Sequence, residues 1–187
     1  MKKTTKAILL VAMLTSLSLF NGCEDLADIP LNIPIVVEFT INGSETSDFE
    51  STSFCLNQYE EWNDNKDKIK SVKFLSAAYW TLDFAPDNLT ATISASVKDK
   101  NGITLFSFML TDVSPGDASI NPYKIELSSE EIDAFNAYLN NLQEDPTCMT
   151  PSFTAQYTVS NVSWSGAEEY TIIGKVEIVL ETVVSVD

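Results

Sequence analysis

Apolar side chains recur at every second position in several stretches of this chain of 187 residues. The clearest alternation covers residues 89–97, and similar runs cover residues 35–41, 69–84, 153–162 and 169–186. A period of two places successive side chains on opposite faces of an extended strand, so each run predicts a strand with one buried face. A chain built chiefly from such strands must pack one sheet against another to bury their apolar faces.

Turn-forming segments separate these runs. Examples are Asn42-Gly43, Ala85-Pro86-Asp87-Asn88 and Asp99-Lys100-Asn101-Gly102. Such segments predict hairpins between neighbouring strands, and the lack of repeated helices between the strands argues against a parallel α/β sheet. The sequence therefore predicts a mainly β protein, an antiparallel β-sandwich that is immunoglobulin-like or jelly-roll-like.

One helix is expected near residues 129–142. Ser128 and Glu131 have the spacing of a capping box, in which each side chain hydrogen-bonds the other residue's backbone N–H. Apolar residues then follow at helical spacing, namely Ile132, Phe135, Tyr138, Leu139 and Leu142. This stripe predicts a short helix that packs against the sandwich.

Several expectations concern the remaining segments. In residues 69–84 the alternation places Trp80 on the core face, together with Val72, Phe74, Ala78, Leu82 and Phe84. Residues 169–186 are long for one strand, so Gly174 is expected to mark a bend or a bulge. Residues 57–68 read as a loop or a short helix, and residues 112–121 as a loop.

The first residues have a distinct pattern of charge and hydropathy. Lys2, Lys3 and Lys6 precede a mostly apolar run over residues 7–20. A basic segment followed by an apolar run of this length is typical of a secretory signal peptide, and the run is shorter than the roughly 20 residues that span a bilayer. We expect residues 1–22 to be a signal peptide.

Phe20-Asn21-Gly22-Cys23 resembles the lipobox of bacterial lipoproteins, in which the cysteine is lipidated and becomes the first mature residue. Gly22 and Cys23 match that family, whereas Phe20 and Asn21 stand where it prefers Leu and a small residue. The alternatives are cleavage at an A-x-A-like site, which does not follow the apolar run, or a Cys23 that pairs with another cysteine. The resemblance implies a lipid on Cys23 of a Gram-negative lipoprotein.

The same resemblance implies a location. An Asp directly after the lipidated cysteine tends to retain such lipoproteins in the inner membrane, and here the residue is Glu24. The expected location is therefore the outer membrane, facing the periplasm or the cell surface. With Pro30 and Pro34 disfavouring regular structure, we expect residues 23–34 to be a tether and residues 35–187 to be a single domain. That domain resembles no family that we can name.

Charge excludes several functions. All basic residues are lysines, and without residues 1–22 eight lysines stand against 27 acidic residues, a net charge of −19. Such a surface repels phosphate backbones, so no nucleic-acid partner is expected. The chain has no His, which excludes Ser-His-Asp and Cys-His catalysis and histidine metal ligands, and no Arg for bidentate anion binding.

The other two cysteines form an even pair once Cys23 is acylated. A bridge between Cys55 and Cys148 is the favoured interpretation in an oxidising compartment, and two buried thiols are the alternative. The bridge would close a loop of about 90 residues, worth roughly 4–5 kcal/mol in the chain-entropy model.

Acidic residues provide the remaining candidates for chemistry. A carboxylate pair for glycoside hydrolysis would come from residues in or near loops, namely Glu60, Glu61, Asp83, Asp87, Asp112 and Asp117. Candidate Ca²⁺ ligands are Asp83/Asp87/Asn88 and Asp112/Asp117, although neither group matches a defined calcium loop. A solvated acidic surface is the simpler interpretation, so we expect no cofactor.

Aromatic residues in polar segments provide the only ligand-binding candidates. Tyr59 and Trp62 lie in a polar segment and Trp164 lies at a turn, where exposed rings could stack on sugars. The alternative is that these rings fold back over the edge of the core, as large aromatics usually do.

The sequence thus favours a lipid-anchored envelope protein with a non-catalytic binding or structural β-sandwich. Its partners would be the membrane, through the lipid, and an envelope protein or a polysaccharide. A carbohydrate-binding lipoprotein associated with glycan uptake is the alternative, and a carboxylate-based glycoside hydrolase is a more remote one.

Overall fold

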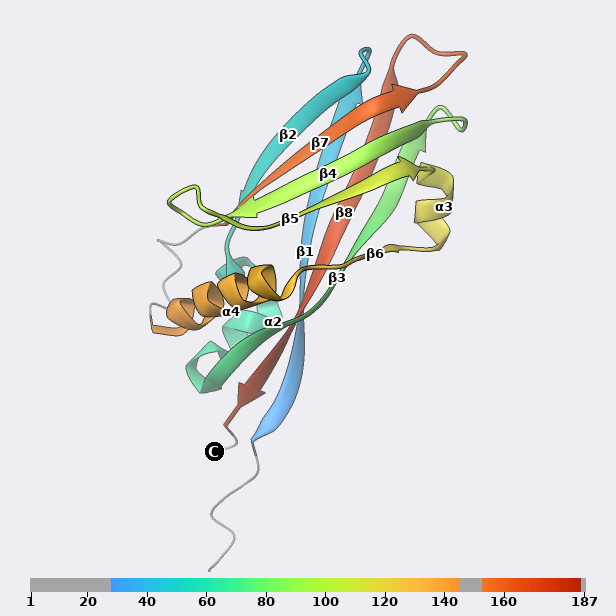
Figure 1. Ribbon diagram of the computed structural model, residues 1–187. Helices are drawn as coiled ribbons and strands as arrows, with labels where there is room; N and C mark the ends of the chain where they lie inside the picture. Colours follow the sequence, from blue (N-terminus) through green and yellow to red (C-terminus); the bar gives the residue numbers. More distant parts are fainter. Residues whose placement is uncertain (1–27, 145–152, 186–187) are drawn as a thin grey trace, which may run out of the picture.

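The computed structural model describes residues 28–144 and 153–185 and folds them into two packed antiparallel sheets (Figure 1). The first sheet has the order β1 (Ile29–Gly43), β8 (Tyr170–Val184), β3 (Ile69–Ala85) and β6 (Tyr123–Ile125). The second sheet has the order β2 (Ser47–Phe54), β7 (Phe153–Ser163), β4 (Thr90–Lys98) and β5 (Thr104–Val113). The predicted antiparallel β-sandwich is confirmed.

The connections between the strands define the topology. Apart from the β4–β5 hairpin, every connection between consecutive strands passes from one sheet to the other. Eight strands wound in this order form a jelly roll, the second of the two sandwich types that we expected. This winding places the first and last strands, β1 and β8, side by side in register from Ile29↔Val184 to Gly43↔Tyr170.

Aromatic rings fill the space between the two sheets. Phe39 of β1 stacks on Tyr157 of β7, with ring centroids 4.2 Å apart, and lies 6.1 Å from the ring of Tyr79 on β3. All three side chains are at most 2 % exposed. Inward positions therefore follow the period of two that the sequence showed, which is most regular along β8.

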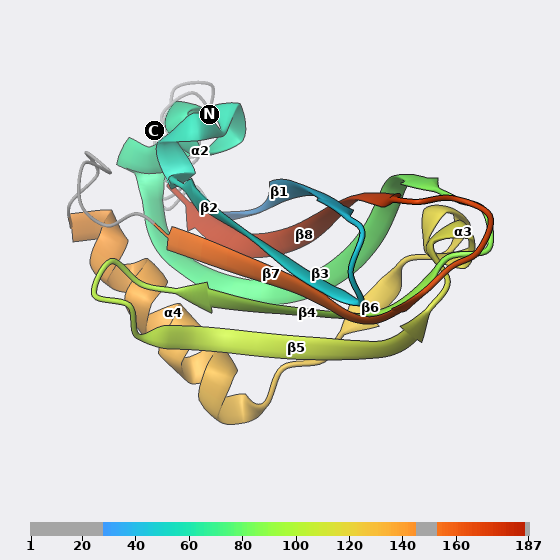
Figure 2. The same cartoon turned by 90° about the horizontal axis from the view of Figure 1, so that it is seen from above.

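Helix α4 (Ser129–Glu144) confirms the predicted helix and its capping box. The backbone N–H of Glu131 donates to Ser128 Oγ at 3.2 Å, and the backbone N–H of Ser128 donates to a Glu131 carboxylate oxygen at 3.0 Å. Phe135 inserts its ring among those of Phe74, Phe106 and Phe153. Figure 2 shows α4 along the open side of the sandwich, next to β5.

Short helices occupy two other segments. Residues 57–68 take the helical alternative, with α2 (Glu60–Asn65) between the 3₁₀ turns η1 (Leu56–Gln58) and η2 (Lys66–Lys68). The expected loop over residues 112–121 is wrong, because α3 (Pro115–Ile120) forms there. The Ser114 hydroxyl accepts from the Asp117 N–H at 3.4 Å and Pro115 occupies the first turn, which together favour a helix start.

The limits and facing of three strands differ from expectation. Residues 29–34 belong to β1 and not to the tether, since pairing with β8 outweighs the two prolines. A register shift between Phe74 and Ser76 turns β3 over, so Tyr79 and Thr81 are buried and Trp80 lies on the outer face beside Lys175. Gly174 marks no bulge in β8, whose alternation is unbroken.

Candidate functional site

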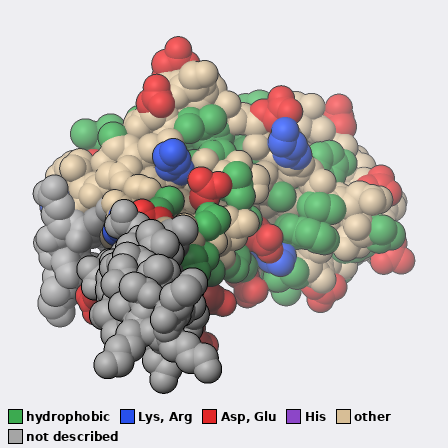
Figure 3. Space-filling view, turned by 90° about the horizontal axis from the view of Figure 1, so that it is seen from below, with side chains coloured by type: hydrophobic (Ala, Val, Ile, Leu, Met, Phe, Trp, Pro, Cys, Tyr) green, Lys and Arg blue, Asp and Glu red, His purple; other side chains and the backbone are tan. Residues whose placement is uncertain are grey.

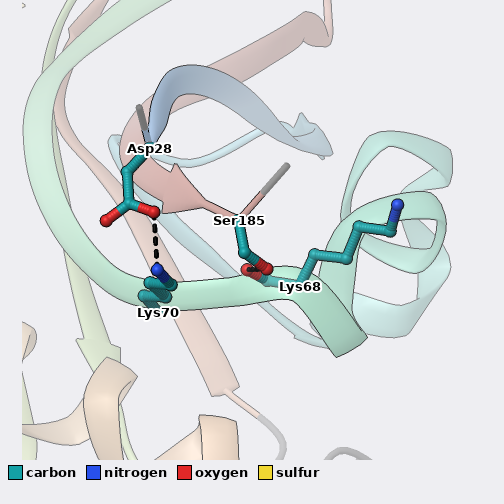
Figure 4. Close-up of polar contacts among 4 residues, drawn as sticks. All are labelled: Asp28, Lys68, Lys70 and Ser185. Atoms are coloured by element: carbon teal, nitrogen blue, oxygen red, sulfur yellow. Dashed lines mark hydrogen bonds and ion pairs between the residues drawn. The ribbon is translucent and has the colours of Figure 1, made fainter. Parts of the chain in front are cut away.

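The two ends of the described domain lie together. Asp28, just before β1, forms an ion pair with Lys70 of β3 at 2.6 Å. At the end of β8, the Ser185 N–H donates to the Lys68 carbonyl at 2.9 Å (Figure 4). We call this end of the sandwich, formed by the start of β1, the end of β8 and the start of β3, the attachment end. A lipid on Cys23, five residues before Asp28, would have to hold the domain from here.

Seen from below, the surface carries scattered acidic side chains and a few lysines (Figure 3). Lys66, Lys68, Lys70 and Lys73 lie at the start of β3 or in the turn before it. None of the helices within residues 28–144 and 153–185 has the length and apolar character needed to cross a membrane.

The outer face of the second sheet has a different composition. Cross-strand pairing aligns its outward side chains in rows: Phe49–Thr158–Ser94–Met109 in one, and Ser51–Gln156–Ser96–Ser107 in the next. A third row begins with Ser53, Thr154 and Lys98. We call these three rows the hydroxyl face, because serine and threonine supply most of the side chains.

The hydroxyl face is hollowed at its centre. A depression of about 440 Å³ has Ser94, Ser96, Ser107, Met109, Gln156 and Thr158 in its lining. Large apolar side chains stand at both ends of the first row, Phe49 on β2 with 69 % exposure and Met109 on β5 with 68 %. Strands lie about 4.8 Å apart, so these two positions are roughly 14 Å from one another.

The polar groups of this face are mostly available for a ligand. Lys98 is the one charged residue in the three rows, and its ammonium donates to the Gln156 side-chain oxygen at 2.7 Å. That contact orients the side-chain amide of Gln156, so its NH₂ group points away from Lys98 and can donate to a ligand. The Ser94 hydroxyl has a long contact of 3.5 Å to the Thr158 carbonyl.

A carboxylate lies at the margin of this face but is already engaged. Glu131 of α4 accepts from the Ser107 N–H at 3.0 Å and from both the N–H and the hydroxyl of Ser128. Burial alone would raise the pKa of Glu131, but these hydrogen bonds outweigh it and hold the pKa below its ordinary value. The carboxylate thus accepts a hydrogen bond from a backbone N–H on the edge of β5.

The aromatic residues singled out from the sequence do not form a site. Trp62 lies on α2 and is 4 % exposed, so the interpretation that it is an exposed stacking platform is wrong. The Tyr59 hydroxyl donates to the Val36 carbonyl at 2.9 Å, and burial raises the pKa of Tyr59 to about 12. Trp164 packs edge-on against Tyr170 and donates to the Ala167 carbonyl. These rings close the core, as the alternative interpretation stated.

The acidic candidates Glu60, Glu61, Asp83, Asp87, Asp112 and Asp117 are all exposed. Asp83 accepts from the neighbouring Phe84 N–H, and the Asn88 side chain hydrogen-bonds Ser165. Asp112 and Asp117 are separated by the turn into α3. Within the described part of the chain, no three acidic, cysteine or histidine side chains come together in an arrangement that could hold a metal ion.

Of the three cysteines, the structure describes Cys55 alone. Cys55 is buried directly after β2, where Phe54 pairs and stacks with Phe153 of β7. Cys23 and Cys148 lie outside the described residues, so lipidation and the Cys55–Cys148 bridge stay predictions. Cys148 precedes Phe153 by five residues, a chain length that reaches about 17 Å when extended and so permits the bridge.

Sequence reasoning missed the hydroxyl face. Its signal is present in the strands themselves, where outward positions such as Ser94, Ser96, Gln156 and Thr158 hold none of the 27 acidic residues of the chain. Only the order of the strands shows that these positions lie side by side, because β2 and β7 are a hundred residues apart in sequence.

Comparison with known proteins identifies no family. No protein-family model matches the chain, and no curated protein does. Among solved structures, the chain is similar to one from Desmodium yellow mottle tymovirus, with a TM-score of 0.39, 10 % identity and coverage of 86 % of this chain and 84 % of that one.

Other solved structures are similar at the same level. One from tobacco necrosis virus has a TM-score of 0.41 and 11 % identity over 86 % of this chain and 98 % of that one. The decameric BFDV capsid protein has a TM-score of 0.39 and 9 % identity over 83 % of this chain and 99 % of that one. These neighbours are jelly-roll β-sandwiches, and nothing about the function of this chain follows from them.

Proposed function

We propose that this protein is a lipid-anchored component of the bacterial cell envelope, with a jelly-roll domain that binds a partner without catalysis. The observation that carries the proposal is the segment Phe20-Asn21-Gly22-Cys23 after a basic and apolar leader. The expected location is the outer membrane, on its periplasmic or its outer surface.

The geometry of the domain is compatible with this anchoring. Strand β1 begins at Ile29, and Asp28 just before it forms an exposed ion pair with Lys70 at the attachment end. Few residues separate Cys23 from this point, so the domain would stand close to the membrane on that end. The hydroxyl face runs along the side of the sandwich and would remain accessible to a partner.

Mass spectrometry of the mature N-terminus tests the anchoring. We expect acyl mass on Cys23 and recovery of the protein with membranes. Cys23→Ala should move the protein to the soluble fraction, whereas Glu24→Gln, which changes the adjacent residue and leaves the thiol, should not. A soluble, unacylated wild-type protein would refute the proposal.

A further inference from the structure

We infer that the hydroxyl face binds an uncharged glycan chain. This inference rests on the proposed binding role of the domain and adds the chemical class of the ligand. It does not depend on the lipid at Cys23. The evidence is the combination of a hollow, an uncharged hydrogen-bonding floor and two exposed apolar side chains on one sheet face.

The floor offers the hydrogen-bonding groups that a sugar requires. Ser94, Ser96 and Thr158 carry hydroxyls that both donate and accept, and Gln156 adds an amide whose oxygen is held by Lys98. Sugar hydroxyls also donate and accept, so such a floor can pair with them in several orientations. A depression of about 440 Å³ is within the range of small-ligand sites, and an open depression admits a chain as well as a single sugar.

The apolar ends of the first row suit the other surface of a sugar. Phe49 and Met109 project from the two edge strands with about two thirds of their surfaces exposed. Each of these side chains offers an apolar surface beside the polar hollow, and the C–H face of a pyranose packs against an aromatic ring or a thioether. Spaced roughly 14 Å apart, they would contact successive parts of an oligosaccharide lying across the strands.

Charge selects the class of glycan. Without residues 1–22 the chain has a net charge of −19, which repels uronic-acid, sulfated and phosphorylated polymers. The one cation of the face, Lys98, already donates to Gln156. A cationic ligand would require carboxylates on the face, and the three rows contain none. Glu131 at the margin is occupied by three hydrogen bonds. An uncharged polymer is the class that these observations leave.

Affinity electrophoresis of the mature protein through gels containing dextran, xylan or galactomannan tests this inference, with polygalacturonate as the anionic comparison. We expect retardation by at least one neutral polysaccharide and none by polygalacturonate. Phe49→Ala and Met109→Ala should each weaken binding about tenfold, and Ser96→Glu should abolish it. Leu82→Ala removes an exposed apolar side chain from the first sheet, 46 % exposed in the wild type, and should leave binding unchanged.

Three results would overturn the inference: no retardation by any neutral polysaccharide, unchanged binding in the Phe49 and Ser96 variants, or a wild-type dimer that Phe49→Ala dissociates. The last would show that a second copy occupies the face. Circular dichroism and the unfolding midpoint of each variant identify any that fail to fold. Membrane fractionation of Phe49→Ala separates the two proposals, since lost glycan binding with retained membrane attachment leaves the anchoring proposal intact.

Discussion

At the scale of single residues, Gly174 shows how the core depends on the absence of a side chain. A Cβ at this position would lie 2.5 Å from Phe39 Cζ and 2.9 Å from Tyr79 Cε2. Both rings are buried, and the ring of Phe39 is held by stacking on Tyr157. The glycine therefore serves packing rather than a turn, since it lies in mid-strand.

We expect Gly174→Ala to lower the free energy of unfolding by about 1–3 kcal/mol, because the added methyl overpacks a core that cannot shift cheaply. Urea unfolding followed by fluorescence measures the change. Gly116→Ala is the matched control. A Cβ at that position would lie 3.4 Å from its nearest neighbour, Phe84 Cζ, and alanine favours the helix α3. Equal stability of both variants would show that the Phe39 ring yields at little cost.

At the scale of elements, α4 closes two strand edges that would otherwise be open. Strand β6 pairs with β3 only from Ala77 to Tyr79, which leaves the earlier edge of β3 without a neighbouring strand. Asn140 of α4 accepts from the Val72 N–H at 3.3 Å and donates to the Val72 carbonyl at 3.1 Å. Asn136 accepts from the Phe74 N–H at 2.6 Å. Edges covered in this way are protected from pairing with other chains.

Asn140→Ala should cost about 1–2 kcal/mol of unfolding free energy, because it leaves both backbone groups of Val72 without partners. Hydrogen exchange should show faster exchange of the Val72 amide in the variant. Asn141→Ala, at the next and exposed position, should change stability by less than about 0.5 kcal/mol. Unchanged protection of Val72 in Asn140→Ala would contradict the role assigned to Asn140.

The Glu131 carboxylate makes the α4 cap pH-dependent. Because its hydrogen bonds hold the pKa of folded Glu131 below the ordinary 4.5, the stabilisation is present above that value and is lost as the pH falls through the folded pKa. We expect Glu131→Gln to be less stable than wild type at pH 7, with the difference shrinking below pH 4.5. Urea midpoints from pH 7 to pH 3 measure this, with Glu130→Gln as control. A difference that stays constant with pH would disprove it.

At the scale of the whole molecule, the jelly roll depends on contacts between distant parts of the chain. Strand β8 pairs with β1 along its full length and with β3 on its other side. Similarly, β2 pairs only with β7, and this ladder ends at Phe54↔Phe153, next to Cys55. A covalent link at this point would fasten the edge strand β2 to the later half of the chain.

We expect the mature protein to contain a Cys55–Cys148 disulfide, whose reduction lowers the free energy of unfolding by roughly 4 kcal/mol in the chain-entropy model. Peptide mapping under non-reducing conditions identifies the bridge, and thermal unfolding with and without reductant measures its contribution. A Cys55→Ser/Cys148→Ser double variant should match the reduced protein. Two thiols that react in the denatured, unreduced protein would contradict the bridge.

Strand character, hairpins and the helix over residues 129–142 followed from local patterns. A period of two and a capping box are properties of neighbouring residues and need no knowledge of the fold. The facing of Trp80 could not be obtained this way, because a register shift near Phe74 reverses the side chains that follow it, up to the next shift between Thr81 and Asp83. The burial of Trp62 could not be predicted either, because the pattern of a polar segment does not indicate which of its residues packs inward.

The sequence by itself determined an acidic, strand-rich chain with a lipoprotein-like leader, and excluded histidine-based and arginine-based chemistry through composition. Only the tertiary structure decided which outward side chains become neighbours. The hydroxyl face joins β2, β7, β4 and β5, and such a surface is defined by strand order and register, which depend on long-range pairing. No local pattern encodes those pairings, because each strand carries only its own alternation of buried and exposed residues.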